Sequence, residues 1–316
     1  MRNGILPSLA IVVPCYNEED IFPICLESLS QILINLISQH KINKNSYILF
    51  VDDGSSDLTW SLVKKAVEKG GDKVKGIKLS KNQGHQIALL AGLSFINTDI
   101  SISIDADLQD DINAIYKMIE EYYNGNDIVY GVRNDRSSDS RFKRTTATSY
   151  YKLMSIMGVY QVENHADFRL LSNRANKSLL KYNESNIYIR GIIPLLGYRS
   201  SKVFYSRKKR VAGQSKYPIK KMLSLAIEGI TSFSIMPLRI ISVLGFITCL
   251  SAMLISLYAL IQKFEGHVIE GWASIMISIF FLGGIQLISI GVIGEYIGKM
   301  YLESKKRPKY FIEEEC

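Results

Sequence analysis

Cysteine is scarce in this chain of 316 residues, which contains four cysteines and two tryptophans. The cysteines Cys15, Cys25, Cys249 and Cys316 lack the paired spacing that structural zinc sites require. They also offer no disulfide framework, so we expect the protein to work in a reducing compartment. A signal peptide is not expected either, because a strand-like run, "SLAIVVP", starts at Ser8.

Charge is absent from two long stretches, Ile240–Gln262 and Gly271–Gly294. Each stretch, as a helix, is long enough to cross a hydrocarbon layer about 30 Å thick. We therefore expect two transmembrane helices. The alternative is a pair of buried helices in a soluble bundle, but such helices are usually shorter and carry a polar stripe.

The formal net charge of +8 is distributed unevenly around these two stretches. The connector 263–270 has one lysine and two glutamates, whereas lysines and arginines are concentrated at 207–221 and at 299–309. Because loops rich in lysine and arginine remain in the cytoplasm, we expect a multi-pass protein with both termini on that side.

Residues 8–132 alternate short apolar runs with amphipathic stretches, which predicts an α/β fold with an open, largely parallel sheet. The predicted strands are Leu9–Val13, Tyr47–Val51, Val74–Leu79, Ile100–Ile104 and Asp127–Tyr130, and the predicted helices cover residues 19–38, 57–69, 84–96 and 112–124. In such sheets, ligands bind beyond the carboxyl ends of the strands. We expect three segments to converge there: "PCYNEE" at 14–19, "DDGSSD" at 52–57 and "DADLQDD" at 105–111.

The alternation ends after Tyr130. A polar, basic loop at 133–146 leads into a predicted helix near 145–157, and a second basic cluster occupies 205–217. The next helix has apolar residues at helical spacing from Ile219 to Phe233, so it either lies at the membrane surface or packs against a core. Basic runs also occur in nucleic-acid-binding proteins. Beside an apolar helix we favour phosphate or lipid head groups and expect no nucleic acid.

Asp105 and Asp107 directly follow an apolar strand-like run. Carboxylate oxygens at such a position suit Mg²⁺ or Mn²⁺, with substrate phosphates completing the coordination shell. Two aspartates one residue apart are common in loops. The pair becomes a stronger signal because Asp52 and Asp53 stand at the end of another predicted strand.

The order of motifs is more specific than any one of them. The motifs "VVPCYNEE", "VDDGSSD", "KNQGHQIALLAGL", "DADLQD", "DFRLLSNRA", "RVAGQSKY" and "LAIEGITSFSIMPLR" follow one another along the chain. In this respect the chain resembles the inverting family 2 glycosyltransferases of GT-A fold. More narrowly, it is similar to the polyprenyl-phosphate glycosyltransferases, a group that includes the dolichol-phosphate mannose synthases. The C-terminal "GVIGEYIGKMYLESKKRPKY" resembles the bactoprenol glucosyltransferase branch.

The resemblance implies roles for individual residues. Positions that line the nucleotide pocket are matched by Pro14, Tyr16, Glu18, Asp52 and Asp53, and the metal-binding motif by Asp105, Asp107 and Gln109. Positions that hold the acceptor phosphate are matched by Arg133, Arg144 and Thr148, and the basic segment that closes over phosphate by Arg210 and Lys216.

Two positions depart from the family pattern. Asp111 stands where relatives commonly have proline, which affects only the start of the next helix. His85 stands near a position where relatives often have a basic residue, and this difference affects which sugar we expect the protein to transfer. We interpret His85 as a polar wall residue rather than a ligand, and Asp57 as a helix cap rather than a catalytic group.

Sugar transfer from a nucleoside diphosphate requires stabilisation of the leaving-group charge, which a divalent cation and fixed lysines or arginines provide. An alcohol acceptor would also need a general base. A phosphate monoester is mostly dianionic at pH 7 and can attack without one. Two hypotheses for Asp167 therefore stay open: it orients Arg169, or it acts as a base on the acceptor.

The expected reaction is inverting transfer of one sugar, glucose from UDP-glucose, to undecaprenyl phosphate at the bacterial inner membrane. The product would serve modification of a cell-surface glycan such as O-antigen, with a flippase and a second glycosyltransferase acting downstream; a homo-oligomer is compatible with the sequence. The expected domains are a cytoplasmic GT-A domain at 1–216, a juxtamembrane amphipathic helix at 217–236, a two-helix transmembrane domain at 237–298 and a cytoplasmic basic tail at 299–316.

Two other functions remain open. A processive polysaccharide synthase would carry a Q-x-x-R-W motif and more membrane helices, and the sequence has neither. A membrane-anchored scaffold that binds nucleotide sugars without turnover is the non-enzymatic alternative.

Overall fold

The computed structural model describes residues 6–134, 165–184, 187–206, 236–265 and 271–316. The chain divides into two compact units. The sheet unit contains the described residues between 6 and 206 together with 307–316, and the helical unit contains those between 236 and 306.

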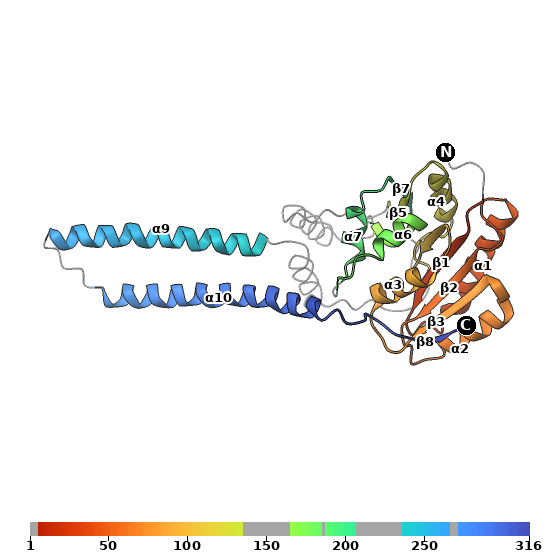
Figure 1. The fold of residues 1–316 in the computed structure, drawn as a ribbon, viewed down its shortest axis with the longest axis horizontal. Coiled ribbons are helices and arrows are strands. Elements are labelled where there is room, and N and C mark those ends of the chain that lie inside the picture. Colours follow the sequence, from red (N-terminus) through yellow and green to blue (C-terminus); the bar gives the residue numbers. More distant parts are fainter. Residues whose placement is uncertain (1–5, 135–164, 185–186, 207–235, 266–270) are drawn as a thin grey trace. The chain divides into compact units, whose positions relative to one another are not determined.

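In the described part of the chain, the sheet unit contains one eight-stranded sheet with the order β7-β5-β6-β4-β1-β2-β3-β8 (Figure 1). Its strands are β1 (Leu9–Cys15), β2 (Tyr47–Asp52), β3 (Val74–Leu79), β4 (Ile100–Ser103), β5 (Ile128–Arg133), β6 (His165–Ser172), β7 (Ser200–Tyr205) and β8 (Ile312–Glu315). The pairs β1–β2, β1–β4, β2–β3 and β5–β7 are parallel, while β6 and β8 pair in antiparallel fashion. The predicted α/β class with a largely parallel sheet is confirmed.

Helices cover both faces of this sheet. They are α1 (Phe22–Ser38), α2 (Thr59–Gly70), η1 (Gly71–Lys73), α3 (His85–Phe95), α4 (Ala114–Tyr123), α6 (Asn173–Leu179) and α7 (Ile189–Leu195). On one face, Leu9, Ile11 and Val13 of β1 share an apolar core with α1, α2 and α4. On the other face, α3 approaches closely at Gly92, where a Cβ would lie 2.5 Å from Val12 Cγ1.

Five strands and four helices were predicted with every bound within three residues of the observed one. They include the central parallel strands, which are buried along their whole length and read as continuous apolar runs. Strands β6, β7 and β8 and helices α6 and α7 were not predicted. Strand β7 alternates exposed and buried residues and carries a lysine, so its apolar signal is weak.

Strand β8 shows that the C-terminal segment is more than a basic tail. It pairs with the outer edge of β3, and the backbone N–H of Gly76 donates to the carbonyl oxygen of Cys316. Lys78 and Glu313 form an ion pair of 2.9 Å across the two strands. The charged sequence Ile312–Glu315 suits an edge strand, whose outer face is solvated.

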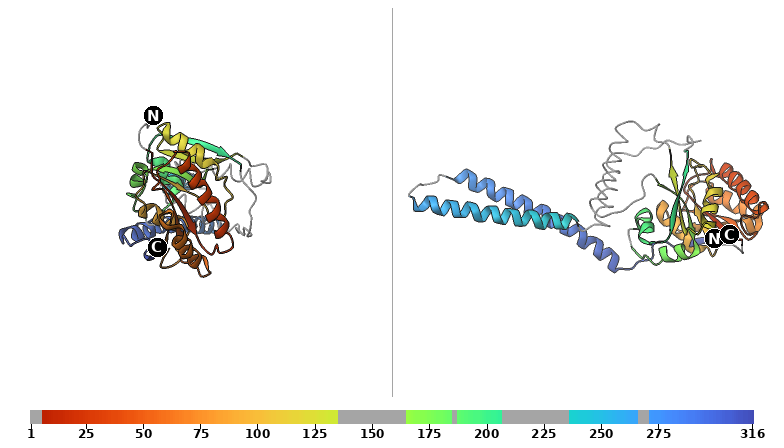
Figure 2. Two further views of the ribbon diagram at one scale, coloured as in Figure 1. Left: turned by 90° about the vertical axis from the view of Figure 1, so that its right-hand side faces the viewer. Right: turned by 90° about the horizontal axis from the view of Figure 1, so that it is seen from above.

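The helical unit consists of two long helices that run side by side, α9 (Met236–Phe264) and α10 (Trp272–Ser304) (Figure 2). The segments Met236–Ile255 and Phe281–Ser304 are long and apolar enough to cross a membrane, and neither is buried within the protein. The predicted pair of apolar helices is therefore present, with α10 extending six residues beyond the expected end of the transmembrane domain at residue 298.

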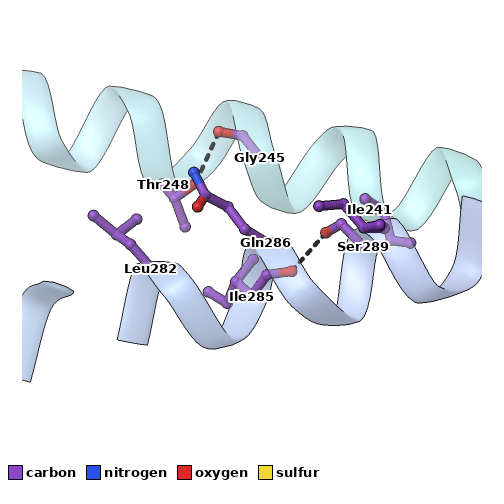
Figure 3. A pocket seen from close by; sticks show the side chains of 8 residues that line it. Ile241, Gly245, Thr248, Leu282, Ile285, Gln286 and Ser289 are labelled. Atoms are coloured by element: carbon purple, nitrogen blue, oxygen red, sulfur yellow. Dashed lines mark hydrogen bonds between the residues drawn. The ribbon is translucent and has the colours of Figure 1, made fainter. Parts of the chain in front are cut away.

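Three polar side chains, those of Thr248, Gln286 and Ser289, lie among the mainly apolar residues that line the groove between α9 and α10 (Figure 3). The hydroxyl of Thr248 donates to the carbonyl of Gly245, and that of Ser289 donates to the carbonyl of Ile285. Gln286 extends from α10 toward α9. Hydroxyl groups that bond within their own helix can be accommodated in hydrocarbon, because their polar atoms are satisfied without water.

Candidate functional site

The sheet topology brings the predicted acidic segments to one edge. Strands β1, β2 and β4 are parallel neighbours, with Cys15 beside Asp52 and Val12 beside Ser103, so their carboxyl ends point the same way. Strand β6 runs in the opposite direction and begins at this edge, where Arg169 pairs with Ser103. Residues after β1, β2 and β4 thus meet residues at the start of β6.

Hydrogen bonds join the loop after β1 to the loop after β2. The N–H of Asn17 donates to Ser55 Oγ at 3.0 Å, and the N–H of Glu18 donates to Thr59 Oγ1 at 2.9 Å. Pro14 is buried in β1, while Tyr16 stands 45% exposed beyond it. The structure therefore holds together the two loops that carry the predicted nucleotide-pocket residues.

Asp52 carries a buried acceptor oxygen at the end of β2. It is fully buried, and its Oδ2 accepts the N–H of Ser55 at 3.1 Å. Its Oδ1 is also buried and has no hydrogen-bond partner within the described residues. Burial raises the pKa of Asp52 above its ordinary value. A buried acceptor without a partner is costly unless a ligand N–H or O–H satisfies it.

Asp53 has a different environment, because both of its oxygens are occupied by backbone. They accept the N–H groups of Gln83 and Gly84, each at 2.8 Å. Burial raises the pKa of Asp53, and these two hydrogen bonds oppose the rise. In this structure Asp53 holds the loop that leads into α3, and its predicted contact with the nucleotide stays a prediction.

Gly54 allows that loop to lie close. Its φ is +69°, and a Cβ would lie 2.7 Å from the carbonyl carbon of Lys81 and 2.8 Å from the nitrogen of Asn82. Both conditions exclude an unstrained side chain at this position.

The predicted metal ligands follow β4. Oδ1 of Asp105 is buried without a hydrogen-bond partner in the described structure, and Oδ1 of Asp107 accepts the N–H of Gln109 at 3.2 Å. Gln109 itself is buried, and Leu108 between them has a φ of +50°. Backbone strain of this kind is concentrated at functional sites.

A carboxylate pair at a strand end fits a hard divalent cation, which would compete with His85 for Asp105 Oδ1. Within the described ranges, no group of three or more His, Cys, Asp or Glu side chains is arranged to hold a metal. A cation at Asp105 and Asp107 would therefore take further ligands from Gln109 or from substrate oxygens.

Asp167 binds three basic side chains. The guanidinium of Arg169, which is 1% exposed, donates to its Oδ1. Arg190 donates from Nε to Oδ1 at 3.1 Å and from Nη2 to Oδ2 at 2.8 Å. His85 Nε2 lies 3.5 Å from Oδ2. Although burial acts in the opposite direction, these groups hold the pKa of Asp167 well below the ordinary value.

This environment favours one of the two readings of Asp167. The predicted contact with Arg169 is present in the structure. A carboxylate with a strongly lowered pKa and cationic donors on both oxygens is a poor proton acceptor at neutral pH. Its arrangement suits a residue that positions cations.

His85 lies between two of the aspartates, a position that the sequence does not reveal. Its Nε2 is 3.4 Å from Asp105 Oδ1 and 3.5 Å from Asp167 Oδ2. Burial alone would lower the pKa of His85, but Asp167 and Asp105 together raise it above the ordinary value. His85 thus connects the predicted metal site to the Asp167 cluster.

Arg133 and Asp57 have clear partners. Arg133 donates from Nε to Oδ1 of the buried Asp110 at 3.0 Å, so its guanidinium is already paired with the segment 105–111. Asp57 accepts the N–H groups of Thr59 and Glu19, at the start of α2 and in the β1 loop. The N-cap of α2 is Leu58, so the prediction of Asp57 as the cap is off by one residue, although Asp57 accepts the N–H of the first helical residue.

Four predicted residues lie outside the described part of the chain, namely Arg144, Thr148, Arg210 and Lys216. Arg190, in contrast, is a site residue that the sequence analysis missed. The only sequence signal is a single arginine in the otherwise apolar segment "IYIRGIIPLL", and its partner Asp167 lies 23 positions earlier.

Comparison with known proteins places this site in context. Residues 10–187 match the family model "Glycosyl transferase family 2", and residues 236–300 match the model "GtrB C-terminal hairpin". The chain is 51% identical over 310 residues to "Uncharacterized glycosyltransferase YkoT" of Bacillus subtilis (strain 168), which covers 97% of this chain and 91% of that protein.

One further relative and one solved structure are similar to the chain. The chain is 38% identical over 309 residues to "Bactoprenol glucosyl transferase" of Shigella phage SfV, covering 97% of this chain and 98% of that protein. Among solved structures it is similar to the mannosyltransferase PcManGT from Pyrobaculum calidifontis in complex with GDP-Man and Mn²⁺. That similarity has a TM-score of 0.45 and 16% identity, and it covers 92% of this chain and 87% of the other.

Proposed function

The chain belongs to glycosyl transferase family 2, and we propose that it transfers a single sugar from a nucleoside diphosphate to a polyprenyl phosphate. The Shigella phage relative, which matches almost end to end, is described as a bactoprenol glucosyl transferase. The match of residues 236–300 to the GtrB C-terminal hairpin supports the same assignment for the helical unit.

The observation that carries the proposal is the set of contacts that the Asp167 carboxylate makes. Three basic side chains contact its carboxylate, which fits a reaction that needs cations rather than a carboxylate base. A phosphate monoester is mostly dianionic at pH 7 and requires no deprotonation. The negative charge of this acceptor is repelled by the diphosphate of the donor, and arginines held in place offset that repulsion.

The donor side of the site is formed by the β1 and β2 loops. We propose that Asp52 Oδ1 accepts an N–H or O–H of the nucleotide, with Pro14, Tyr16 and Glu18 lining the same pocket. Asp53 contributes to the same pocket by holding the loop at Gln83 and Gly84 in place. The buried, unsatisfied oxygen of Asp52 supports this assignment.

Asp105, Asp107 and Gln109 would hold Mg²⁺ or Mn²⁺ beside the diphosphate. When bound, the cation supplies positive charge that stabilises the departing nucleoside diphosphate. The chain's own contribution is to fix these oxygens directly after a buried strand, next to His85 and Asp167.

The acceptor side includes Arg133, with Arg144 and Thr148 proposed for the acceptor phosphate and Arg210 and Lys216 for the segment that closes over phosphate. The apolar helices α9 and α10 suit a lipid-linked acceptor, since both segments are long enough to span a bilayer. We propose a multi-pass protein with both termini in the cytoplasm of a bacterium. The proposed organisation is a GT-A domain at 1–216 to which strand β8 also belongs, a juxtamembrane helix at 217–236, and a transmembrane pair at 237–298 whose second helix continues to Ser304.

The finer proposal is glucose from UDP-glucose, undecaprenyl phosphate as acceptor, and inversion at the anomeric carbon. The product would enter a cell-surface glycan pathway of the O-antigen type, with a flippase and a second glycosyltransferase acting later. A homo-oligomer is compatible with this assignment.

A donor panel tests this function. Full-length protein in lipid nanodiscs is incubated with Mg²⁺, undecaprenyl phosphate and, in separate reactions, UDP-glucose, UDP-galactose, UDP-GlcNAc or GDP-mannose. A mild-acid-labile lipid product from one donor supports the proposal, whereas polymer would indicate a processive synthase. Donor binding without transfer from any sugar nucleotide would indicate the non-catalytic scaffold.

A further inference from the structure

Arg190 is held at the site by a two-point contact that leaves part of its guanidinium free. Its Nε and Nη2 donate to the two oxygens of Asp167, at 3.1 and 2.8 Å. Within the described residues, Nη1 has no hydrogen-bond partner, and the Arg190 side chain is 39% exposed. An arginine fixed along one edge of its fork presents its remaining N–H groups in a defined direction.

Arg190 is more than the counter-ion that Asp167 needs. Arg169 is fully buried against the same carboxylate and already balances its charge. Arg190 therefore adds a second positive charge beside Asp167, within a cluster whose other carboxylate is Asp105. Fixed positive charge of this kind stabilises anionic substrates that must meet.

The position of Arg190 connects it to the reacting groups. The N–H of Ile189, at the start of α7, donates to Gln86 Oε1 of α3 at 2.9 Å. This contact fixes the start of α7 beside the start of α3, where His85 contacts both Asp105 and Asp167. Arg190 therefore lies in the cluster that adjoins the predicted metal ligands.

We propose that Arg190 binds a phosphate oxygen at the reaction centre, with Asp167 as the residue that positions it. The proposal rests on the proposed function and adds a binding residue to it. The phosphate belongs either to the nucleoside diphosphate donor or to the polyprenyl phosphate acceptor. Both offer the same chemistry, which is a charged oxygen that accepts hydrogen bonds from guanidinium.

A matched control exists in the same sheet unit. Arg174 contacts Asp127 with the same fork, Nε to Oδ1 at 2.7 Å and Nη2 to Oδ2. Asp127 precedes β5 and its carbonyl accepts the N–H of Ser172 at the far end of β6, so this pair lies at the opposite edge of the sheet from Asp167. Loss of Arg174 removes an arginine–aspartate pair without touching the site.

The test compares Arg190→Gln, Arg190→Lys and Arg174→Gln with the wild type, as full-length proteins in nanodiscs. UDP-glucose is varied at saturating undecaprenyl phosphate, and then the acceptor is varied at saturating donor. We expect Arg190→Gln to lower kcat/KM by about 100-fold or more, as for loss of one preorganised donor. Arg190→Lys should recover part of this loss, and Arg174→Gln should remain within a few-fold of wild type.

The substrate whose KM rises more in Arg190→Gln identifies the phosphate that Arg190 binds. Melting temperatures of all four proteins exclude unfolding as the cause, and assays run below the lowest of them. Wild-type kinetics in Arg190→Gln, or an equal loss in Arg174→Gln, would overturn the proposal.

Failure of the proposed function can be distinguished from failure of the proposal for Arg190. If wild-type protein transfers no sugar, the affinities for UDP-glucose and for undecaprenyl phosphate are measured by binding alone. Weaker binding of one of them by Arg190→Gln would still support the phosphate contact. Equal affinities in wild type and Arg190→Gln for both compounds would refute it.

Discussion

The indole Nε1 of Trp60 donates a hydrogen bond of 3.0 Å to Oε2 of Glu314, across 254 positions of sequence. Trp60 belongs to α2, and Glu314 lies in β8, the outermost strand of the sheet beside β3. Lys64, one turn further along α2, reaches the same carboxylate oxygen at 3.3 Å. The segment that follows the apolar hairpin therefore returns to the sheet unit and becomes part of it.

This return predicts that β8 stabilises the sheet unit. Deletion of residues 312–316 should lower the melting temperature by several degrees, because the edge of β3 loses its backbone partner and Trp60 loses its acceptor. Glu314→Gln keeps the strand and an acceptor oxygen for Trp60, and should change the melting temperature less. Differential scanning fluorimetry checks both, and equal stability of the deletion variant and wild type would contradict the prediction.

Gly54→Ala should disturb the loop that precedes α3. The added Cβ would collide with backbone atoms of Lys81 and Asn82 at 2.7–2.8 Å, and φ is +69°. Strain at such a position costs about 1–3 kcal/mol, and the loop held by Asp53 should shift. We expect weaker UDP-glucose binding, measured by isothermal titration calorimetry.

Gly71→Ala is the control for this substitution. Its φ is +53°, but a Cβ there would have no atom within 4 Å. The two variants share the left-handed strain and differ in the collision. Equal donor affinity in both variants would show that the Asp53 loop does not shape the nucleotide pocket.

Asp107→Asn should abolish most transfer if the carboxylate pair holds a divalent cation. Loss of one charged ligand should lower kcat/KM by roughly 100-fold or more, and EDTA should inactivate the wild type. Asp57→Asn, which changes a residue at the start of α2, should retain most activity. Near-full activity of Asp107→Asn in the transfer assay would refute the metal assignment.

Asp167→Asn should destabilise the sheet unit as well as impair transfer. The substitution leaves Arg169 as a charged group that is only 1% exposed and has lost its anionic partner. Removing one member of a buried ion pair costs about 3–5 kcal/mol. Urea denaturation followed by far-ultraviolet circular dichroism measures this loss, and a change below about 1 kcal/mol would contradict a buried pair.

The central parallel sheet could be predicted from sequence because its strands are apolar throughout and short loops separate them from amphipathic helices. The acidic strand ends could be placed at one edge for the same reason, since parallel neighbours share their direction. Strand β8 could not be predicted, because "IEEE" becomes a strand through pairing with β3 rather than through its own apolar pattern.

The role of Arg190 could not be inferred from local sequence for a related reason. Its contacts with Asp167, and the contact of Ile189 with Gln86, join segments separated by 23 and 103 positions. His85 was visible as a departure from the family pattern, but its place between Asp105 and Asp167 depends on how α3 meets β4 and β6. Such positions follow from tertiary packing.

The most direct test of the central claim is a comparison of undecaprenyl phosphate with undecaprenol as acceptors for radiolabelled UDP-glucose. Purified full-length protein with Mg²⁺ should give a mild-acid-labile, solvent-extractable product from the phosphate and none from the alcohol, because a phosphate monoester needs no base and Asp167, paired with two arginines, is a poor one. Equal labelling of the alcohol, or no labelled lipid from undecaprenyl phosphate with any sugar nucleotide, would contradict the account.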